Sequence, residues 1–234
     1  MCDVSDGVVL VHGGYHGAWC WDDVRAAMTT PSVAVDLPGR GTRPWPGRRV
    51  TFADCAAAVL EDADAAGFAR FLLVGHSLGG LTISTVANTA PDRLTGVVYL
   101  AALAPPPGST VFDLLAPGQD VIDPAGTQAV LDPELSRAMF AGDLDDGAFA
   151  MAEARLVPEP TGLFIEAIPA YQHDVPVTYV RATRDAVVTA GLVAAMLPHL
   201  QPDTEVEIES DHDTMLSHPA ETASLLDGLA AGAS

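Results

Sequence analysis

The chain has 234 residues, of which 49% are hydrophobic, and a formal net charge of −20 at pH 7. A chain of this size and composition can bury one sizeable core, so a single domain over residues 1–234 is expected. Its negative field repels polyanions, which excludes nucleic acid and anionic membranes as expected partners.

Cysteine content and the N-terminus also narrow the possibilities. Cys2, Cys20 and Cys55 show no metal-ligand spacing and are odd in number, so neither a zinc site nor a disulfide framework is expected. The opening MCDVSDG has no basic region, and no apolar stretch approaches the roughly 20 residues of a membrane span. These features favour a soluble, cytoplasmic protein; they do not distinguish a monomer from a homodimer.

Six short apolar runs recur along the chain, typical of strands buried on both faces of a parallel sheet. They occupy residues 8–12, 32–36, 71–75, 96–102, 177–182 and 205–209. Alanine-rich stretches at 51–67, behind a capping threonine, and at 218–232 predict helices. The alternation predicts an α/β fold with a doubly wound, mostly parallel sheet of about six strands.

Residues 105–172, called the inserted segment below, interrupt this alternation between the fourth and fifth predicted strands. The segment begins with PPPG, contains no convincing strand and includes the helical pieces PELSRAMFAG and DDGAFAMAEARL. It is too long for an ordinary crossover, and lids over active sites are often built in this way. We interpret it as a helical cap, with an extra helical pair packed on a sheet edge as the alternative.

The stretch GHSLGG at residues 75–80 follows the apolar run FLLV and precedes a predicted helix. Gly75 to Gly79 fit the pattern G-x-S-x-G, in which small residues allow a sharp strand-to-helix turn that exposes the serine. The sequence therefore predicts that Ser77 is a nucleophile.

A serine hydroxyl needs a base to take its proton, normally a histidine oriented by a carboxylate. Asp185 follows the predicted strand VTYVRA and His212 follows EVEIE, so both fall in loops at the carboxyl ends of strands. We predict that they are the acid and the base. The rival histidines and acids flank His212 directly or lie at helix ends or on the wrong side of a strand: His173, His199, His218, Asp174, Asp211 and Asp213.

The oxyanion of a tetrahedral intermediate needs donors that are already in place. Leu78 offers a backbone N–H at the start of the predicted helix, and the glycine pair in VHGGYHGAW offers that of Gly14. We predict that these two groups form an oxyanion hole, with an ordinary glycine-rich strand end as the alternative for Gly14.

Four stretches, VVLVHGGYHGAWCW, DLPGRG, LLVGHSLGG and SDHDTMLSHPAE, give the chain a resemblance to the α/β-hydrolase superfamily. Within it the chain resembles the branch of plant methylesterases, hydroxynitrile lyases and bacterial esterase-like relatives. The resemblance implies an α/β-hydrolase fold that lacks the two leading strands of larger members. It also implies a Ser77–His212–Asp185 triad, an oxyanion hole at Gly14 and Leu78, and no cofactor.

Departures from that branch narrow the expected chemistry. Hydroxynitrile lyases resemble this chain but carry a threonine just after the loop histidine and a lysine just after the catalytic histidine. Here these places hold Gly13 and Asp213, and a carboxylate beside the site opposes cyanide release. The plant methylesterases carry an apolar residue at the second place. Haloalkane dehalogenases and epoxide hydrolases of this fold use an aspartate at the position of Ser77.

The sequence thus predicts a serine hydrolase that cleaves a carboxylic ester or thioester of a small, partly hydrophobic molecule through an acyl-serine. A lyase or elimination enzyme on the same triad, and a ligand receptor with vestigial turnover, are the alternatives. Apolar residues of the inserted segment are expected to bind substrate: Phe112, Leu115, Phe140, Phe149 and Phe164.

Overall fold

The computed structural model describes residues 5–115, 126, 131–171 and 174–232. Its centre is one sheet whose strands lie in the order β2-β1-β3-β4-β5-β6, with every neighbouring pair parallel. The strands are β1 (Ser5–Val11), β2 (Ser32–Val35), β3 (Phe68–His76), β4 (Leu94–Leu100), β5 (Val177–Ala182) and β6 (Thr204–Ile208). The six predicted strands are confirmed, and their carboxyl ends meet at one edge.

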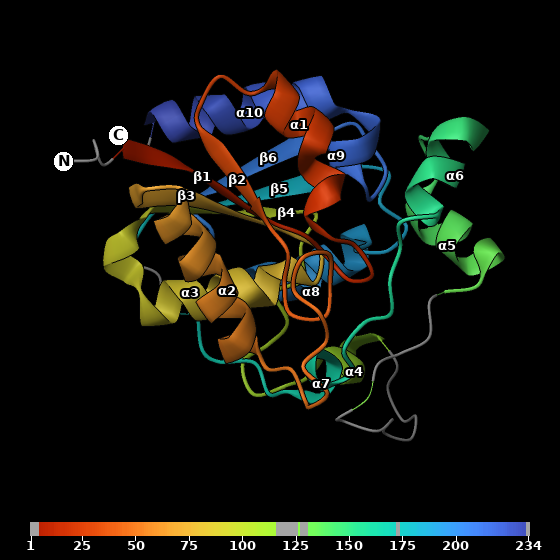
Figure 1. Ribbon diagram of the computed structural model, residues 1–234, viewed down its shortest axis with the longest axis horizontal. Coiled ribbons are helices and arrows are strands. Elements are labelled where there is room, and N and C mark those ends of the chain that lie inside the picture. Colours follow the sequence, from red (N-terminus) through yellow and green to blue (C-terminus); the bar gives the residue numbers. More distant parts are fainter. Residues whose placement is uncertain (1–4, 116–125, 127–130, 172–173, 233–234) are drawn as a thin grey trace.

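Helices cover both faces of this sheet (Figure 1). One face carries α1 (Asp22–Ala27), α9 (Thr214–Ser217) and α10 (Pro219–Gly232); the other carries α2 (Phe52–Ala65), α3 (Gly79–Thr89) and α8 (Ala190–Leu200). Short 3₁₀ turns, η1 (Ala18–Trp21) and η2 (Pro91–Arg93), precede α1 and β4. Because side chains alternate along a strand, Val9 and Val11 pack in the core on the α2 side, while Val8 and Leu10 pack in the core on the α10 side.

Helix α2 begins where its sequence signals predict. The Thr51 hydroxyl accepts the Asp54 N–H at 3.2 Å, and the Asp54 carboxylate accepts the Thr51 N–H at 3.0 Å, which is a reciprocal capping box. The helix ends at Ala65, and Gly67 follows with a positive φ of 75°. These contacts satisfy amide groups that the first turn of a helix leaves without intrahelical partners.

The inserted segment carries α4 (Val111–Leu115), α5 (Pro133–Phe140), α6 (Asp146–Glu153) and α7 (Gly162–Ile165). Figure 1 shows α5 and α6 beyond the carboxyl edge of the sheet and α4 and α7 close together below them. Among its described residues the segment contributes no strand to the sheet. Helices α5 and α6 match the two helical pieces predicted from the sequence.

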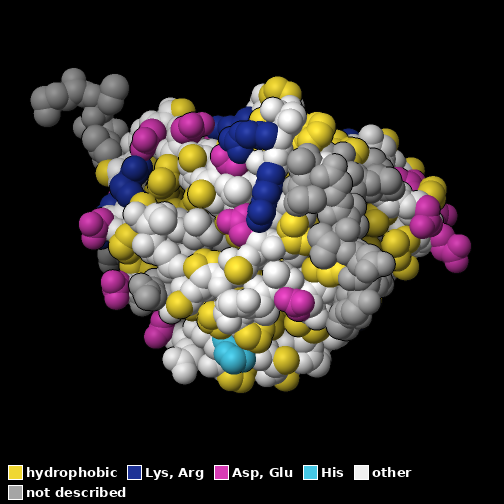
Figure 2. All heavy atoms as spheres, turned by 90° about the horizontal axis from the view of Figure 1, so that it is seen from below, with side chains coloured by type: hydrophobic (Ala, Val, Ile, Leu, Met, Phe, Trp, Pro, Cys, Tyr) yellow, Lys and Arg dark blue, Asp and Glu magenta, His cyan; other side chains and the backbone are white. Residues whose placement is uncertain are grey.

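The surface charge and the length and polarity of the helices relate to the expectation that nucleic acid and membranes are not partners. On the face seen in Figure 2, acidic side chains are scattered, with basic side chains and apolar patches between them. Within the described ranges, every helix is too short or too polar to cross a membrane.

Candidate active site

Ser77 lies in the turn between β3 and α3. Its φ is 51°, a left-handed conformation that residues other than glycine rarely adopt. Gly79 allows this turn to lie against the loop after β1, because a Cβ on Gly79 would lie 2.6 Å from the His12 carbonyl oxygen. The predicted sharp strand-to-helix turn is therefore present, and it places the serine at the carboxyl edge of the sheet.

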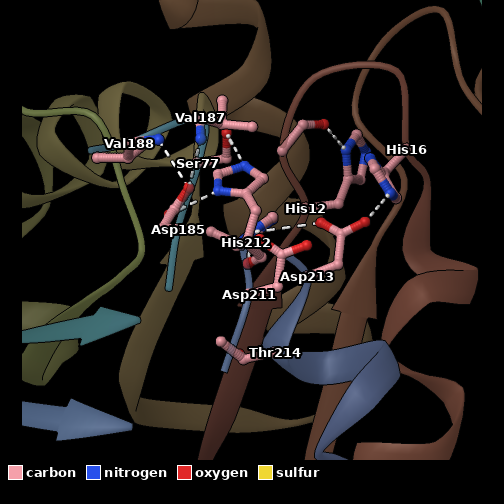
Figure 3. A network of polar contacts seen from close by, with 12 residues as sticks. His12, His16, Ser77, Asp185, Val187, Val188, Asp211, His212, Asp213 and Thr214 are labelled. Atoms are coloured by element: carbon pink, nitrogen blue, oxygen red, sulfur yellow. Dashed lines mark hydrogen bonds and ion pairs between the residues drawn. The ribbon is translucent and has the colours of Figure 1, made fainter. Parts of the chain in front are cut away.

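The structure brings Ser77, His212 and Asp185 together from three different loops (Figure 3). The Ser77 hydroxyl lies 3.0 Å from Nε2 of His212, and Nδ1 of His212 donates to Oδ2 of Asp185 at 2.8 Å. The other Asp185 oxygen accepts the N–H groups of Val187 and Val188 at 2.7 and 2.8 Å. These contacts hold His212 in the tautomer whose free nitrogen faces the serine.

The local environment sets the charges of this triad. Burial alone would lower the pKa of His212, but the hydrogen bond to Asp185, together with the charges of Asp185 and nearby Asp213, outweighs it and raises the pKa above 6.5. Burial alone would raise the pKa of Asp185, but the bonds from His212 and from two backbone amides lower it. Asp185 is therefore a carboxylate at neutral pH, and His212 is a base of increased strength.

Gly14 and Leu78 both line the same cavity as Ser77 and His212. Within the described residues, neither backbone N–H donates a hydrogen bond to the protein. The peptide that carries the Gly14 N–H is fixed by His12, whose Nδ1 donates to the Gly13 carbonyl at 2.7 Å while its Nε2 accepts the Leu37 N–H at 3.2 Å. Burial lowers the pKa of His12 to about 3, so the ring is neutral and keeps this arrangement.

The cavity above Ser77 has about 470 Å³ of space free of protein atoms, part of which is open to solvent. Apart from the serine and the histidines its described walls are formed by glycine, apolar and aromatic residues: Gly14, Tyr15, Leu78, Leu103, Val111, Met139, Phe140, Phe164 and Val187. No arginine or acidic side chain is among these described lining residues. The site therefore favours an uncharged, apolar group next to the nucleophile.

Of the described residues that we expect to contact substrate in the inserted segment, only two line the cavity. Phe140 and Phe164 line the cavity, and the Phe140 ring stacks on His212 at a centroid distance of 6.1 Å. Phe112 and Phe149 correct the expectation, because neither is among the described lining residues. Val111 takes the inward position on α4, and the next residue of a helix points elsewhere; Phe149 packs beneath Arg137 at 4.8 Å. The Leu115 side chain lies outside the described part.

A buried polar cluster beside the triad was not predicted from the sequence. Asp213 is not among the described residues that line the cavity; its carboxylate contacts Nε2 of His16 at 3.1 Å and Nε2 of His76 at 3.7 Å. Burial alone would raise the pKa of Asp213, but the charge and hydrogen bond of His16, with the charges of His76 and His212, lower it. In the sequence, His16, His76 and Asp213 are only polar residues in the regions that follow predicted strands. His16 and Asp213 are 197 residues apart, so no local pattern links them.

His76, His212 and Asp213 are also the one group among the described residues whose ligand-type atoms lie within 4.8 Å of one another. Both ring nitrogens of His212 already contact Asp185 and Ser77, and Nε2 of His76 donates to the His212 carbonyl at 3.0 Å. A metal ion here would have to break the triad, so these residues do not fit a metal centre.

A serine, a histidine and an aspartate joined in this order at the carboxyl edge of a doubly wound parallel sheet define the class of hydrolases with a nucleophile elbow. The family model described as "Alpha/beta hydrolase family" matches residues 8–225. The chain belongs to this family.

Named relatives and solved structures agree with this assignment. The chain is 39% identical over 113 residues to "Probable esterase PIR7A" of Oryza sativa subsp. indica, a match that covers 46% of the chain and 43% of that protein. It is 28% identical to "Methylesterase 7" of Arabidopsis thaliana, covering 93% and 94% of the two chains. The structure of tomato methylketone synthase I complexed with 2-tridecanone is similar with a TM-score of 0.81 at 25% identity, covering 99% and 100%.

Proposed function

We propose that this protein is a serine esterase that cleaves a carboxylic ester or thioester through an acyl-serine. The observation that carries the proposal is the continuous chain from Ser77 Oγ to His212 Nε2 at 3.0 Å and from His212 Nδ1 to Asp185 at 2.8 Å. The names of similar proteins, which include esterases and a methylesterase, support ester hydrolysis.

Each step of the reaction has a residue at hand. Ser77 attacks the carbonyl carbon while His212 takes the hydroxyl proton, and Asp185 stabilises the imidazolium that forms. The N–H groups of Gly14 and Leu78 bind the developing oxyanion. His212 then gives the proton to the departing alcohol or thiol, and a water molecule activated by His212 hydrolyses the acyl-serine.

The substrate class follows from the cavity walls. The described part of the wall is largely apolar and has no arginine, which favours a small, uncharged, partly hydrophobic ester over an anionic one. We assign the inserted segment the role of a cap, because its residues Met139, Phe140 and Phe164 close the cavity over Ser77. The proposal includes a cytoplasmic location and a monomer or homodimer as the working form.

The lyase alternative is weakened by the environment of Gly13. A Cβ at this position would lie 2.7 Å from the Ser77 Cβ, so a threonine there requires the nucleophile to shift. Product analysis in H₂¹⁸O distinguishes the two reactions, because hydrolysis puts the label in the acid and elimination does not.

A fluorophosphonate probe followed by mass spectrometry tests the nucleophile. We expect one adduct, on Ser77, and its loss in Ser77→Ala together with a fall in p-nitrophenyl ester hydrolysis of about 10⁶-fold, as for other serine nucleophiles. Folded wild-type protein whose Ser77 stays unmodified would overturn the proposal. A panel of neutral and anionic acyl esters then tests the expected preference for neutral apolar groups.

A further inference from the structure

Tyr15 follows Gly14 in the loop after β1 and has an unusual backbone. Its φ is 64°, a left-handed conformation that is costly for a residue with a large side chain. Such a conformation persists only when its surroundings hold it. The contacts that hold Tyr15 therefore also determine where the neighbouring Gly14 peptide lies.

The inserted segment supplies these contacts. The Glu159 carboxylate accepts the Tyr15 N–H at 2.7 Å, and the Val157 N–H donates to the Tyr15 carbonyl at 2.9 Å. The Tyr15 ring packs with Leu156 and Phe140 in a small apolar cluster. Both backbone groups and the side chain of Tyr15 thus rest on the inserted segment, and its bond to Glu159 joins positions 144 residues apart.

Glu159 is itself held by a buried partner. Its other carboxylate oxygen contacts the Arg40 guanidinium, and both side chains are almost completely buried. Burial lowers the pKa of Arg40 to about 10, which still leaves it charged at neutral pH. Burying such a pair is costly, and an apolar pair of similar volume often stabilises a fold as well or better. A contribution to stability therefore does not explain why Arg40 and Glu159 form a buried ion pair here.

His16 holds the opposite side of the Gly14–Tyr15 peptide, whose N–H Glu159 binds. Its Nδ1 lies 2.8 Å from the Gly14 carbonyl and its Nε2 lies 3.1 Å from the Asp213 carboxylate. Each ring nitrogen of His16 therefore faces an oxygen that can accept a hydrogen bond. The His16 ring stacks on the Trp19 ring at a centroid distance of 5.3 Å, which also fixes its position.

The Gly14–Tyr15 peptide thus lies between two buried polar pairs, with its carbonyl bound by His16 and its N–H bound by Glu159. We propose that Glu159, supported by Arg40, is a positioning residue that together with His16 aims the Gly14 N–H at the oxyanion. Seating of the inserted segment then completes the oxyanion hole. This inference rests on the proposed function, because it assumes that Gly14 N–H binds an oxyanion.

The test compares two double variants that differ in one acceptor. Arg40→Met/Glu159→Leu replaces the ion pair by apolar side chains and leaves the Tyr15 N–H without its acceptor, whereas Arg40→Met/Glu159→Gln keeps an amide oxygen there. We expect kcat for a p-nitrophenyl ester to be about 10- to 100-fold lower in the Leu variant, with KM nearly equal, because a misplacement near 1 Å costs up to about 10²-fold. The Gln variant should retain most of kcat.

A second readout separates positioning from general damage. The affinity of an alkyl boronic acid, which forms a tetrahedral adduct on Ser77, should fall in the Leu variant by the same factor as kcat. Arg137→Gln, which removes the exposed pairing of Arg137 with Asp146 within the inserted segment, is the control and should leave both values unchanged.

Three outcomes decide the matter. Equal kcat in the two double variants, with active wild type, overturns this inference alone. Wild type that neither hydrolyses esters nor reacts with the fluorophosphonate overturns the proposed function and the inference with it. If the Leu variant does not fold, amide hydrogen exchange in the wild type decides: a protected Tyr15 amide supports the inference, and an unprotected one overturns it.

Discussion

His212 concentrates most of the electrostatics of the site in one side chain. Its ring is fully buried, its Nδ1 faces Asp185, and the carboxylates Asp211 and Asp213 flank it in the sequence. Asp213 is not among the described residues that line the cavity, and its charge raises the pKa of His212. Three carboxylates near one imidazole favour its protonated form, which is the form that the attack of Ser77 generates.

A pH profile tests whether the pKa of His212 is raised. The neutral form of His212 is the base, so kcat/KM should rise with pH along a limb whose midpoint lies above the ordinary value of about 6.5. Asp185→Asn removes the hydrogen-bonded carboxylate, so the midpoint should move to lower pH and kcat should fall by about 10⁴-fold. A limb centred below 6.5 in the wild type, or one unmoved in the variant, would contradict this account.

The sequence predicts where strands and helices lie better than it predicts which of their side chains meet. The capping signal at Thr51 and the apolar runs marked α2 and all six strands, because local chemistry determines them. The sequence could not show which side chains of the inserted segment face the cavity, because Val111 and Phe112 are both apolar and only packing decides which of them lines it. The pairs His16–Asp213 and Tyr15–Glu159 were missed because no local pattern links positions so far apart.

The start of α2 provides a prediction at the element scale. Thr51→Ala removes the side-chain acceptor for the Asp54 N–H, so the free energy of unfolding should fall by about 1 kcal/mol, measured by urea denaturation. Because Thr51 is not among the described residues that line the cavity, kcat should not change below the unfolding transition. Thr89→Ala, at the exposed end of α3, is the matched control and should shift stability by less than about 0.5 kcal/mol. Equal effects of the two substitutions would refute the capping role.

At the scale of the whole molecule, the fold buries several histidines whose titration couples catalysis to stability. His12 and His76 are completely buried, and burial, as the largest cause, lowers the pKa of each to about 3. His212 is shifted in the opposite direction. The same loops that assemble the triad therefore make the folded state sensitive to pH on both sides of 6.5.

The acid side gives the prediction for the whole molecule. Below pH 6.5 the unfolded chain binds a proton at His12 and at His76 while the folded protein does not, so stability should fall as pH falls from about 6.5 toward 3. Each histidine contributes up to about 1.4 kcal/mol per pH unit. Above pH 6.5 the raised pKa of His212 acts oppositely, because its stabilisation is lost as the pH rises through the folded value. Urea unfolding at several pH values should show a maximum in the free energy of unfolding near pH 6.5.

His12→Gln should reduce the slope of the free energy of unfolding below pH 6.5 by about half, whereas His199→Gln, on the exposed side of α8, should leave this slope unchanged. An acid slope that His12→Gln leaves intact would show that His12 is protonated in the folded protein.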